Sequence, residues 1–397
     1  KTPHQYFYYY NGNRLAGVRS GPWKLRVPTT VGEDFGGYLR LSDPTMLLPR
    51  ALYNLTFDPQ EQKSVLEDHP DVAEKLQAMI EVGVRGIMFQ ETFGSGPEQC
   101  EASMAALRTR VAELAPTQTD LVRLGISPHA PYTVSDRLYE ACAEFAAESG
   151  YRMGLHISES AAEMELVREG TGDFAREWVE RGLEVVPRGR SPVELLERTG
   201  CLDGAPLLIH CVRLDADDIA TIRKHGCSVA HCPASNAKFG HGISPVVELI
   251  DAGVVVGLGS DSVASNNRMD ILEEARLAVL FQRASRRNER VVPARQALEM
   301  ATIDGARSLR IDDKVGSLEV GKDADISVFP LDVARVTPVG DVVAAVIFAV
   351  AGADASFVAV RGRPLLVDGV PVYPDDGLRD RVKAAGEALR GWETAQV

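Results

Sequence analysis

Five short apolar runs in this sequence each end in a residue that can bind a metal or transfer a proton. Four of them end in histidine, as Leu-Gly-Ile-Ser-Pro-His129, Met-Gly-Leu-His156, Leu-Leu-Ile-His210 and Ser-Val-Ala-His231, and the fifth ends in Gly-Ser-Asp261. Imidazole nitrogens and carboxylate oxygens are the ligands that zinc accepts in catalytic sites. A single histidine after an apolar run is more often a hydrogen-bonded core residue. Five such positions in order favour an enzyme site, and their residue types indicate a metal-dependent one.

The elements that must position these residues follow from the same pattern. The apolar runs are separated by stretches of helical length, which is typical of parallel strands joined by helices. In a (β/α)8 barrel the C-terminal ends of all strands open onto one face, so residues distant in sequence converge there. We therefore expect an α/β fold of the TIM-barrel type. A further strand, over 84–91, ends in Glu91, which is expected to contact the substrate.

Composition narrows the class of ligand and the compartment. A net charge of −13 over 397 residues argues against nucleic acid, because phosphate binding requires a basic face. The sequence has no apolar run of about 18 residues, so no transmembrane helix is expected. Six cysteines without a Cys-x-x-Cys pair, and no signal-peptide order, favour buried thiols in a cytoplasmic protein. We expect a small-molecule substrate and no nucleic-acid or membrane partner. The composition leaves a homo-oligomer open.

The first fifth of the chain has a different pattern. Residues 16–27 alternate apolar and polar side chains around Gly21-Pro22, which predicts a β-hairpin. The segment ALYNLTFDPQEQ follows at 51–62, and a continuous helix is expected over 72–81. This order resembles the C-terminal subdomain of sulfatases over residues 1 to about 75. The sequence lacks the Cys-x-Pro-x-Arg segment that supplies the sulfatase nucleophile, so this part is not expected to hydrolyse sulfate esters.

From about residue 80 the motifs resemble the amidohydrolase superfamily. Within it they are most similar to the branch that contains methylthioadenosine/S-adenosylhomocysteine deaminases, aminodeoxyfutalosine deaminases and triazine chlorohydrolases. The motifs that carry the resemblance are Pro128-His129-Ala-Pro-Tyr-Thr133, His156-Ile-Ser-Glu159, His210-Cys-Val, His231-Cys-Pro-Ala-Ser-Asn236 and Gly259-Ser-Asp261-Ser-Val-Ala-Ser-Asn266. The segment 315–325 adds the strand-turn-strand by which such chains return to a small β-sandwich.

The resemblance implies a role for each of these residues. His156 and Asp261 would be metal ligands of one divalent ion, zinc first and iron as the alternative, and Asp261 would also accept the proton of the attacking water. Glu159 would carry the proton to the leaving nitrogen. His210 would polarise the nucleophile or, in members with two metals, serve as a ligand. The residues expected to face the substrate are His129, His231, Asn236 and Glu91. The implied reaction is deamination of a purine nucleoside-like or other heterocyclic substrate.

One feature sets this chain apart from that superfamily. Amidohydrolases of this type begin their barrel with a strand that ends in His-x-His, and this sequence contains no His-x-His. The sulfatase-like segment stands where the first strands of the barrel should be. We therefore expect a sulfatase-like α+β segment over 1–75, an amidohydrolase barrel over 76–310 that lacks its first strands, and a small β-sandwich remnant with a C-terminal helix over 311–397.

The missing imidazoles leave three interpretations of function. The first is a metal-dependent hydrolase of C–N bonds, whose activity in this chain would require ligands from outside this sequence. The second is a catalytically inactive fusion or truncated remnant. The third is a non-catalytic module in which the sulfatase-like segment binds a carbohydrate or sulfated ligand. Because a catalytic zinc usually has three protein ligands, the sequence predicts weak or no activity in this chain.

Overall fold

The computed structural model describes residues 85–115, 118–372 and 380, and the backbone of six short strands between residues 7 and 54. Four of these strands form an antiparallel sheet in the order β1-β2-β3-β6, and β4 pairs with β5. Their bounds are β1 Phe7–Asn11, β2 Arg14–Ser20, β3 Trp23–Arg26, β4 Thr29–Thr30, β5 Leu47–Leu48 and β6 Ala51–Asn54. The antiparallel pairing of β2 with β3 confirms the predicted hairpin. The helix expected over 72–81 lies outside the described residues.

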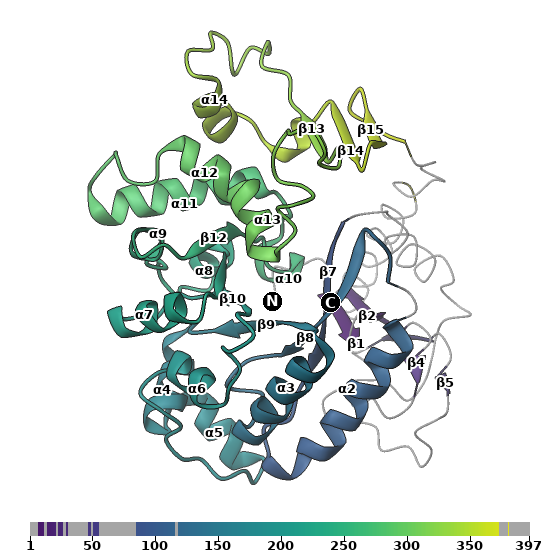
Figure 1. Ribbon diagram of the computed structural model, residues 1–397, viewed down its shortest axis with the longest axis vertical. Helices are drawn as coiled ribbons and strands as arrows, with labels where there is room; N and C mark the ends of the chain where they lie inside the picture. Colours follow the sequence, from purple (N-terminus) through teal and green to yellow (C-terminus); the bar gives the residue numbers. More distant parts are fainter. Residues whose placement is uncertain are drawn as a thin grey trace, which may run out of the picture.

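Six parallel strands form the central sheet, in the chain order β7 to β12 (Figure 1). Their bounds are β7 Gly86–Thr92, β8 Val122–Pro128, β9 Arg152–Ile157, β10 Leu207–His210, β11 Ser228–His231 and β12 Val255–Leu258. Each apolar run singled out in the sequence is therefore a strand, and each pairs with the next one along the chain. This sequential, parallel order confirms the expected α/β architecture of the TIM-barrel type.

The sheet is open along one side. Among the strands that the structure describes, β7 pairs only with β8, and β12 pairs only with β11. Strand β1 approaches β7 without pairing with it, so the N-terminal hairpin does not extend the parallel sheet. Residues 55–84, which precede β7, lie outside the described part of the chain, so the expected loss of the first barrel strands stays a prediction.

Helices alternate with these strands, and local signals fix where they begin and end. The Ser135 hydroxyl accepts a hydrogen bond from the Leu138 N–H at the start of α3, and Gly150 ends that helix with a φ of 73°. The helix bounds are α2 Cys100–Leu114, α3 Asp136–Ser149, α4 Ala161–Glu169, α5 Gly172–Glu180, α6 Pro192–Arg198, α7 Ala216–Lys224, α8 Pro233–Lys238, α9 Val246–Asp251, α10 Val263–Asn266, α11 Ile271–Arg286, α12 Ala294–Ala301 and α13 Ile303–Leu309, with a 3-10 turn at Pro97–Gln99.

The main core lies between the sheet and its covering helices. Strand residues with at most 2% exposure that belong to it are Ile126, Leu155, Ile157, Leu208, Val229 and Val256. Close strand packing needs glycine at one point, because a Cβ on Gly125 would lie 2.6 Å from the Phe89 ring and 2.7 Å from the Arg152 carbonyl oxygen. All six cysteines are buried and free, as expected. Within the described ranges, no helix combines the length and the apolar character that a membrane span requires.

A small module follows the barrel strands. It contains a four-stranded antiparallel sheet in the order β13-β14-β15-β16, together with α14 and a 3-10 turn. The bounds are β13 Ile326–Val328, α14 Val342–Ala349, the 3-10 turn Gly352–Asp354, β14 Phe357–Val360, β15 Arg363–Val367 and β16 Val370–Pro371. Arg85, just before β7, ties this module to the barrel by ion pairs to Asp325 at 2.7 Å and Asp323 at 2.5 Å.

The predicted strand-turn-strand over 315–325 is wrong in detail. These residues form turns and extended loop, and the first strand of the module begins only at Ile326. Gly316 and Gly321 adopt left-handed backbone conformations, with φ of 94° and 97°, which a strand does not accommodate. The Asp323 N–H also donates to the Lys314 carbonyl oxygen at 2.8 Å, so the segment closes on itself instead of pairing.

Candidate active site

The predicted site residues gather at the C-terminal ends of the parallel strands. His129 directly follows β8, His156 is the penultimate residue of β9, and His210 ends β10. His231 ends β11, and Asp261 stands three residues after β12. The fold therefore carries side chains that are up to 132 residues apart to one edge of the sheet, as the parallel order requires.

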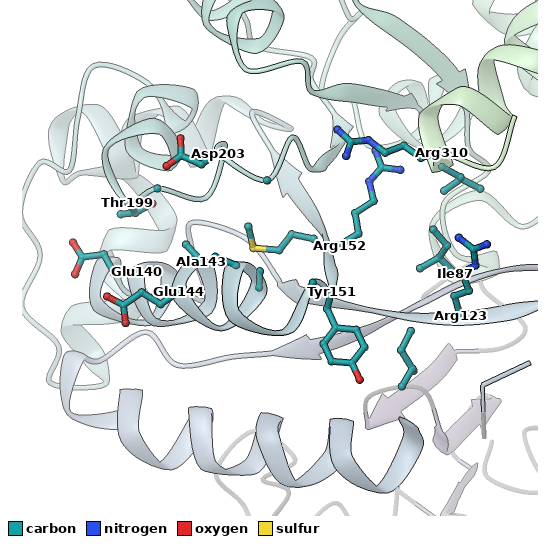
Figure 2. Close-up of a pocket in the computed structure, with 18 of the residues that line it drawn as sticks. Ile87, Arg123, Glu140, Ala143, Glu144, Tyr151, Arg152, Thr199, Asp203 and Arg310 are labelled. Carbon is teal, nitrogen blue, oxygen red and sulfur yellow. The ribbon is translucent and has the colours of Figure 1, made fainter. Parts of the chain in front are cut away.

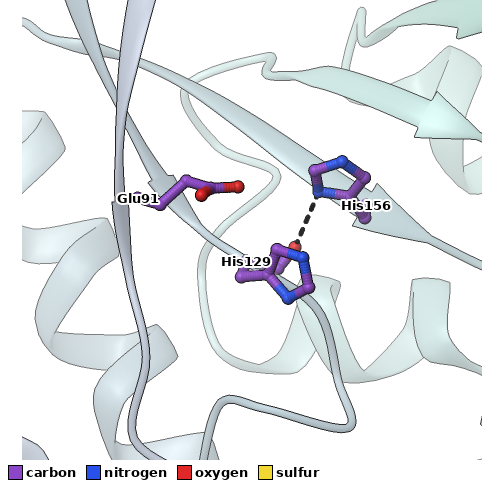
Figure 3. A group of neighbouring side chains, drawn as sticks. All are labelled: Glu91, His129 and His156. Carbon is purple, nitrogen blue, oxygen red and sulfur yellow. Dashed lines mark hydrogen bonds between the residues drawn. The ribbon is translucent and has the colours of Figure 1, made fainter. Parts of the chain in front are cut away.

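Two of these histidines and the predicted Glu91 form a close group. Glu91 from β7, His129 and His156 each offer one ligand atom, and these atoms all lie within 4.8 Å of one another. Figure 3 shows the Glu91 carboxylate directed toward the two imidazoles. This set is drawn from three successive strands. Within the described part of the chain it is the group whose donor atoms are close enough to hold a metal ion.

Hydrogen bonds fix the tautomers of both imidazoles. His156 Nδ1 lies 3.3 Å from the His129 carbonyl oxygen, so Nδ1 is the donor. His129 Nδ1 lies 2.8 Å from Thr133 Oγ1, whose own proton goes to the Ala130 carbonyl at 3.1 Å. Nδ1 of His129 is therefore a donor as well. In the neutral form each imidazole keeps a free lone pair on Nε2, which is the arrangement that a metal ligand needs.

Electrostatics favour the same protonation states. Burial lowers the pKa of His129 and of His156, with a further lowering from neighbouring histidines, and Asp261 raises that of His156. Both rings are therefore neutral near pH 7. Burial raises the pKa of Glu91 to about 7, so this carboxyl exchanges its proton in the neutral range. The three groups fit a divalent cation, because imidazole nitrogens and a carboxylate oxygen are borderline and hard donors of the kind that zinc and iron accept.

Glu159 lies between two further histidines. Its Oε1 is 3.6 Å from His210 Nε2 and 3.3 Å from His241 Nε2. His210 Nδ1 is held by Asn236 Oδ1 at 3.0 Å, which leaves the lone pair of Nε2 on the side of Glu159. Burial raises the pKa of Glu159, while His241 and His156 lower it. The carboxyl is thus placed to hold a proton and to release it toward a bound molecule.

A residue that the sequence did not single out positions Glu159. Glu163 is fully buried, and its two carboxylate oxygens accept hydrogen bonds from the N–H groups of Ser158 at 2.7 Å and Glu159 at 2.8 Å. Burial raises its pKa to about 8, and these N–H bonds oppose the rise. The signal in the sequence is Ser160-Ala-Ala-Glu163, a capping-box pattern at the start of α4.

Asp261 and His210 stand in strained backbone. Their φ values are 56° and 74°, in the left-handed region where a non-glycine residue costs about 1–3 kcal/mol. Such strain concentrates at functional sites. The Asp261 carboxylate accepts from Ser235 Oγ and from the Ser262 N–H, each at 2.6 Å. Asp261 lies outside the close group of Glu91, His129 and His156, so its role as a metal ligand stays a prediction.

Aromatic side chains border His129. The Phe93 ring lies 5.0 Å from the imidazole, and Tyr132 meets it edge-on at 5.7 Å. Tyr132 in turn stacks on Phe174 at 4.4 Å, and Trp178 Nε1 donates to the Tyr132 carbonyl oxygen at 2.8 Å. These contacts hold flat apolar surface beside the ligand group, where a planar ring can stack.

Two residues predicted to face the substrate, His231 and Asn236, are almost fully buried. Asn236 is 1% exposed, and its side-chain oxygen accepts a hydrogen bond from His210 Nδ1. His231 is 2% exposed, its Nδ1 has no hydrogen-bond partner in the described part of the chain, and burial lowers its pKa to about 3. Substrate contact by His231 and Asn236 stays a prediction. In the structure, Asn236 orients His210 through their hydrogen bond.

Comparison with protein families identifies two regions. Residues 63–369 match the amidohydrolase family, and residues 2–117 match the C-terminal region of aryl-sulfatase. The two matches overlap over residues 63–117. Both resemblances expected from the sequence motifs are thereby confirmed.

Curated relatives support the first match. The chain is 34% identical over 295 residues to the 5-methylthioadenosine/S-adenosylhomocysteine deaminase of Moorella thermoacetica, which covers 74% of this chain and 64% of the relative. It is 30% identical over 300 residues to the 5′-deoxyadenosine deaminase of Methanopyrus kandleri, which covers 76% of this chain and 65% of the relative. The chain thus spans slightly less than two thirds of the length of either protein.

Solved structures give the same result for the fold. A zinc-bound adenosine deaminase from Xanthomonas campestris superimposes with a TM-score of 0.68 at 27% identity, over 80% of this chain and 69% of that one. Atrazine chlorohydrolase from Arthrobacter aurescens, complexed with zinc, gives a TM-score of 0.64 at 26% identity, over 79% and 68% of the two chains. Zinc is present in both of these neighbours.

Proposed function

This chain belongs to the amidohydrolase family, and we propose that it is a metal-dependent hydrolase of non-peptide C–N bonds that deaminates a purine nucleoside-like heterocycle. The observation that carries the proposal is the convergence of Glu91, His129 and His156, whose donor atoms lie within 4.8 Å of one another. The reactions named for the relatives, deamination of methylthioadenosine, S-adenosylhomocysteine and deoxyadenosine, support the choice of substrate class.

The metal that we assign is one divalent ion, zinc in the first instance and iron as the alternative. His156 is the ligand shared by the sequence prediction and the close group, and Glu91 and His129 are the other two members of that group. Asp261 remains a candidate fourth ligand. When bound, such an ion acts as a Lewis acid that makes water nucleophilic near neutral pH.

Glu159 is the residue that moves the proton in this proposal. Its raised pKa keeps a larger protonated fraction at neutral pH than an exposed glutamate has. The carboxyl faces His210 and His241, so the proton is delivered at Oε1 to the leaving nitrogen. General acid catalysis of this kind contributes about 10² to 10⁴ in rate. Glu163 keeps Glu159 in place by fixing its backbone N–H.

Substrate orientation falls to the aromatic residues. A purine ring can stack on a flat aromatic side chain without base-specific hydrogen bonds. Phe93 and Tyr132 present such a surface beside His129. A heterocycle held there has its exocyclic nitrogen near the Glu91, His129 and His156 group. This supports a planar, nitrogen-bearing ring as the substrate.

A second candidate is an inactive remnant. The specific observation in its favour is the open sheet, in which β7 and β12 have no mutual pairing among the described strands, combined with the absence of His-x-His. We also propose the division into 1–75, 76–310 and 311–397. Limited proteolysis that cuts first near residues 75 and 310 would support this division, and cuts within the barrel strands would count against it.

The experiment that separates the two candidates measures metal content first. The full chain is dialysed against a weak chelator, and zinc and iron are determined by mass spectrometry. About one metal per chain, followed by ammonia release from adenosine, deoxyadenosine or methylthioadenosine, supports the hydrolase. A chain that holds metal stoichiometrically but releases no ammonia from any of these substrates refutes the deaminase assignment. Absence of retained metal identifies the inactive remnant.

A further inference from the structure

A cavity of about 920 Å³ lies at the N-terminal ends of β8 and β9. The same two strands carry His129 and His156 at their other ends, so the cavity opens on the side of the sheet opposite to the candidate active site. Its walls come from the start of β8 and β9, the C-terminal half of α3, the loop after α6 and the end of α13 (Figure 2). Its volume lies in the range of small-molecule sites.

Arg152, the first residue of β9, is a half-buried cation in the wall of this cavity. Its Nη2 donates to Ser228 Oγ at 2.8 Å, and Ser228 donates onward to the Ser308 carbonyl at 2.9 Å. Nε and Nη1 are shielded from solvent, and among the described residues neither has a hydrogen-bond partner. The guanidinium is therefore fixed at one end while three N–H hydrogens on the other two nitrogens lack an acceptor.

A second arginine lies beside it. Figure 2 shows the guanidinium groups of Arg152 and Arg310 next to each other at one end of the cavity. Burial and the charge of Arg310 lower the pKa of Arg152 to about 10, so Arg152 is still cationic at neutral pH. Within the described ranges neither arginine forms an ion pair with a carboxylate. Two adjacent guanidinium groups, one of them half-buried, are unfavourable unless an anion compensates their charge.

We propose that this cavity is a binding site for a small organic anion whose terminal phosphate or carboxylate lies between Arg152 and Arg310. An oxyanion there neutralises the like charges of the two guanidinium groups. Guanidinium groups match the geometry of both oxyanions. The site is distinct from the candidate active site and does not depend on the proposed deaminase function.

The remaining walls restrict the body of this ligand. Leu124, Tyr151 and Leu309 provide apolar surface beside the arginines. Glu140 and Glu144 line the far end of the cavity, away from Arg152 and Arg310 in Figure 2. These carboxylates repel a molecule that is charged along its whole length, such as a polyphosphate. The cavity therefore fits an apolar or aromatic body with a single anionic end.

Calorimetric titration of the full chain with phenyl phosphate, benzoate and inorganic phosphate tests the proposal. We expect saturable one-to-one binding of phenyl phosphate or benzoate, tighter than binding of inorganic phosphate, and the preferred probe identifies the anionic group. Arg310→Gln, at an exposed side chain, weakens this binding about tenfold, which corresponds to one charge-assisted hydrogen bond. The matched control is Arg307→Gln, one turn earlier on α13 and paired with Asp304, which leaves binding unchanged.

Two outcomes overturn the proposal. One is the absence of saturable binding of either organic anion, and the other is equal binding by Arg310→Gln and the parent chain. His156→Asn separates this site from the active site, because it leaves the anion affinity unchanged if the ligand binds at the arginines and reduces it if the ligand binds at the histidines.

A second variant tests the unpaired state of Arg152 directly. Arg152→Met keeps the Ser228 hydroxyl bonded to Ser308, so it leaves no new orphan group. If the arginine awaits a ligand, the ligand-free variant is at least as stable to urea as the parent chain, and anion binding is lost. A strong loss of stability with no change in anion binding would show that a group of the chain itself pairs with Arg152, and the proposal would fail.

Discussion

The His241 imidazole lies against the Glu159 carboxylate, with 3.3 Å between Nε2 and Oε1. His241 comes from the loop after α8, where it stacks on Phe239 at 5.6 Å. Its charge is among the contributions that lower the pKa of Glu159 against the effect of burial. The loop therefore sets how readily Glu159 holds a proton.

Removal of this imidazole is expected to raise the pKa of Glu159. In His241→Asn the lowering contribution disappears and the raising effect of burial remains. Carbon-detected NMR titration of the glutamate carboxyls, assigned with Glu159→Gln, measures the change. His225→Asn serves as a control because that residue ends α7 and pairs with Glu197. An unaltered Glu159 titration in His241→Asn would show that the contact has no electrostatic effect.

Metal retention should depend on residues that the superfamily resemblance does not assign as metal ligands. Glu91→Gln and His129→Asn each remove one member of the close group, so each is expected to lower zinc affinity at least tenfold, in line with the loss of a ligand. Competition against a chromophoric chelator gives the affinities. If both variants bind zinc as tightly as the parent chain while Asp261→Asn does not, the metal is held by His156 and Asp261 instead.

Stability of the metal-free chain should fall as the pH rises toward 7. The pKa of Glu91 is about 7 in the folded chain against an ordinary value of 4.5, so between these pH values the folded state holds a proton that the unfolded state has released. Unfolding is then favoured by rising pH. Glu91→Gln removes this effect, and above pH 7 the variant is expected to be more stable by up to about 3 kcal/mol.

Urea unfolding in chelator at pH 5, 6, 7 and 8 measures the difference between the two chains. The stabilisation of Glu91→Gln should shrink toward pH 5, where Glu91 is protonated in the folded state. A difference that is constant across this range would mean that Glu91 does not titrate there.

Arg85 should be important for attachment of the C-terminal module. Its side chain is 8% exposed and pairs with Asp325, at 22%, and loss of one partner from such a pair leaves an uncompensated carboxylate. We expect Arg85→Met to destabilise the chain by about 2–4 kcal/mol in urea unfolding. Arg108→Met, which breaks an exposed pair with Glu148 at 3.6 Å, should cost less than about 1 kcal/mol. Similar losses in both variants would contradict the structural role of Arg85.

Gly125 should tolerate no side chain. A Cβ there would stand 2.6 Å from the Phe89 ring and 2.7 Å from a backbone oxygen of Arg152, so strand spacing has to change. Gly125→Ala is expected to cost about 1–3 kcal/mol of unfolding free energy, measured by thermal or urea unfolding. Gly204→Ala, where the Cβ would meet no atom within 4 Å, is the control and should have little effect. A neutral Gly125→Ala would mean that β7, β8 and β9 are packed less closely.

The sequence by itself determined the strands, their parallel order and the residues at their C-terminal ends. It did so because apolar runs, capping residues such as Ser135 and glycine signals such as Gly150 act over a few neighbours. The N-terminal hairpin was predictable for the same reason. The turn over 315–325 was not, since two glycines with left-handed backbone replaced the expected strand.

Only the tertiary structure decided which of these residues meet. Glu91 joins His129 and His156, which lie 38 and 65 positions further along the chain, because pairing of the strands brings the three residues together. No local pattern encodes such a contact. The contact of His241 with Glu159 and the placement of Arg152 beside Arg310 arise in the same way. Local sequence sets the conformation of each element, whereas long-range packing and burial set the partners and the pKa values of the side chains between them.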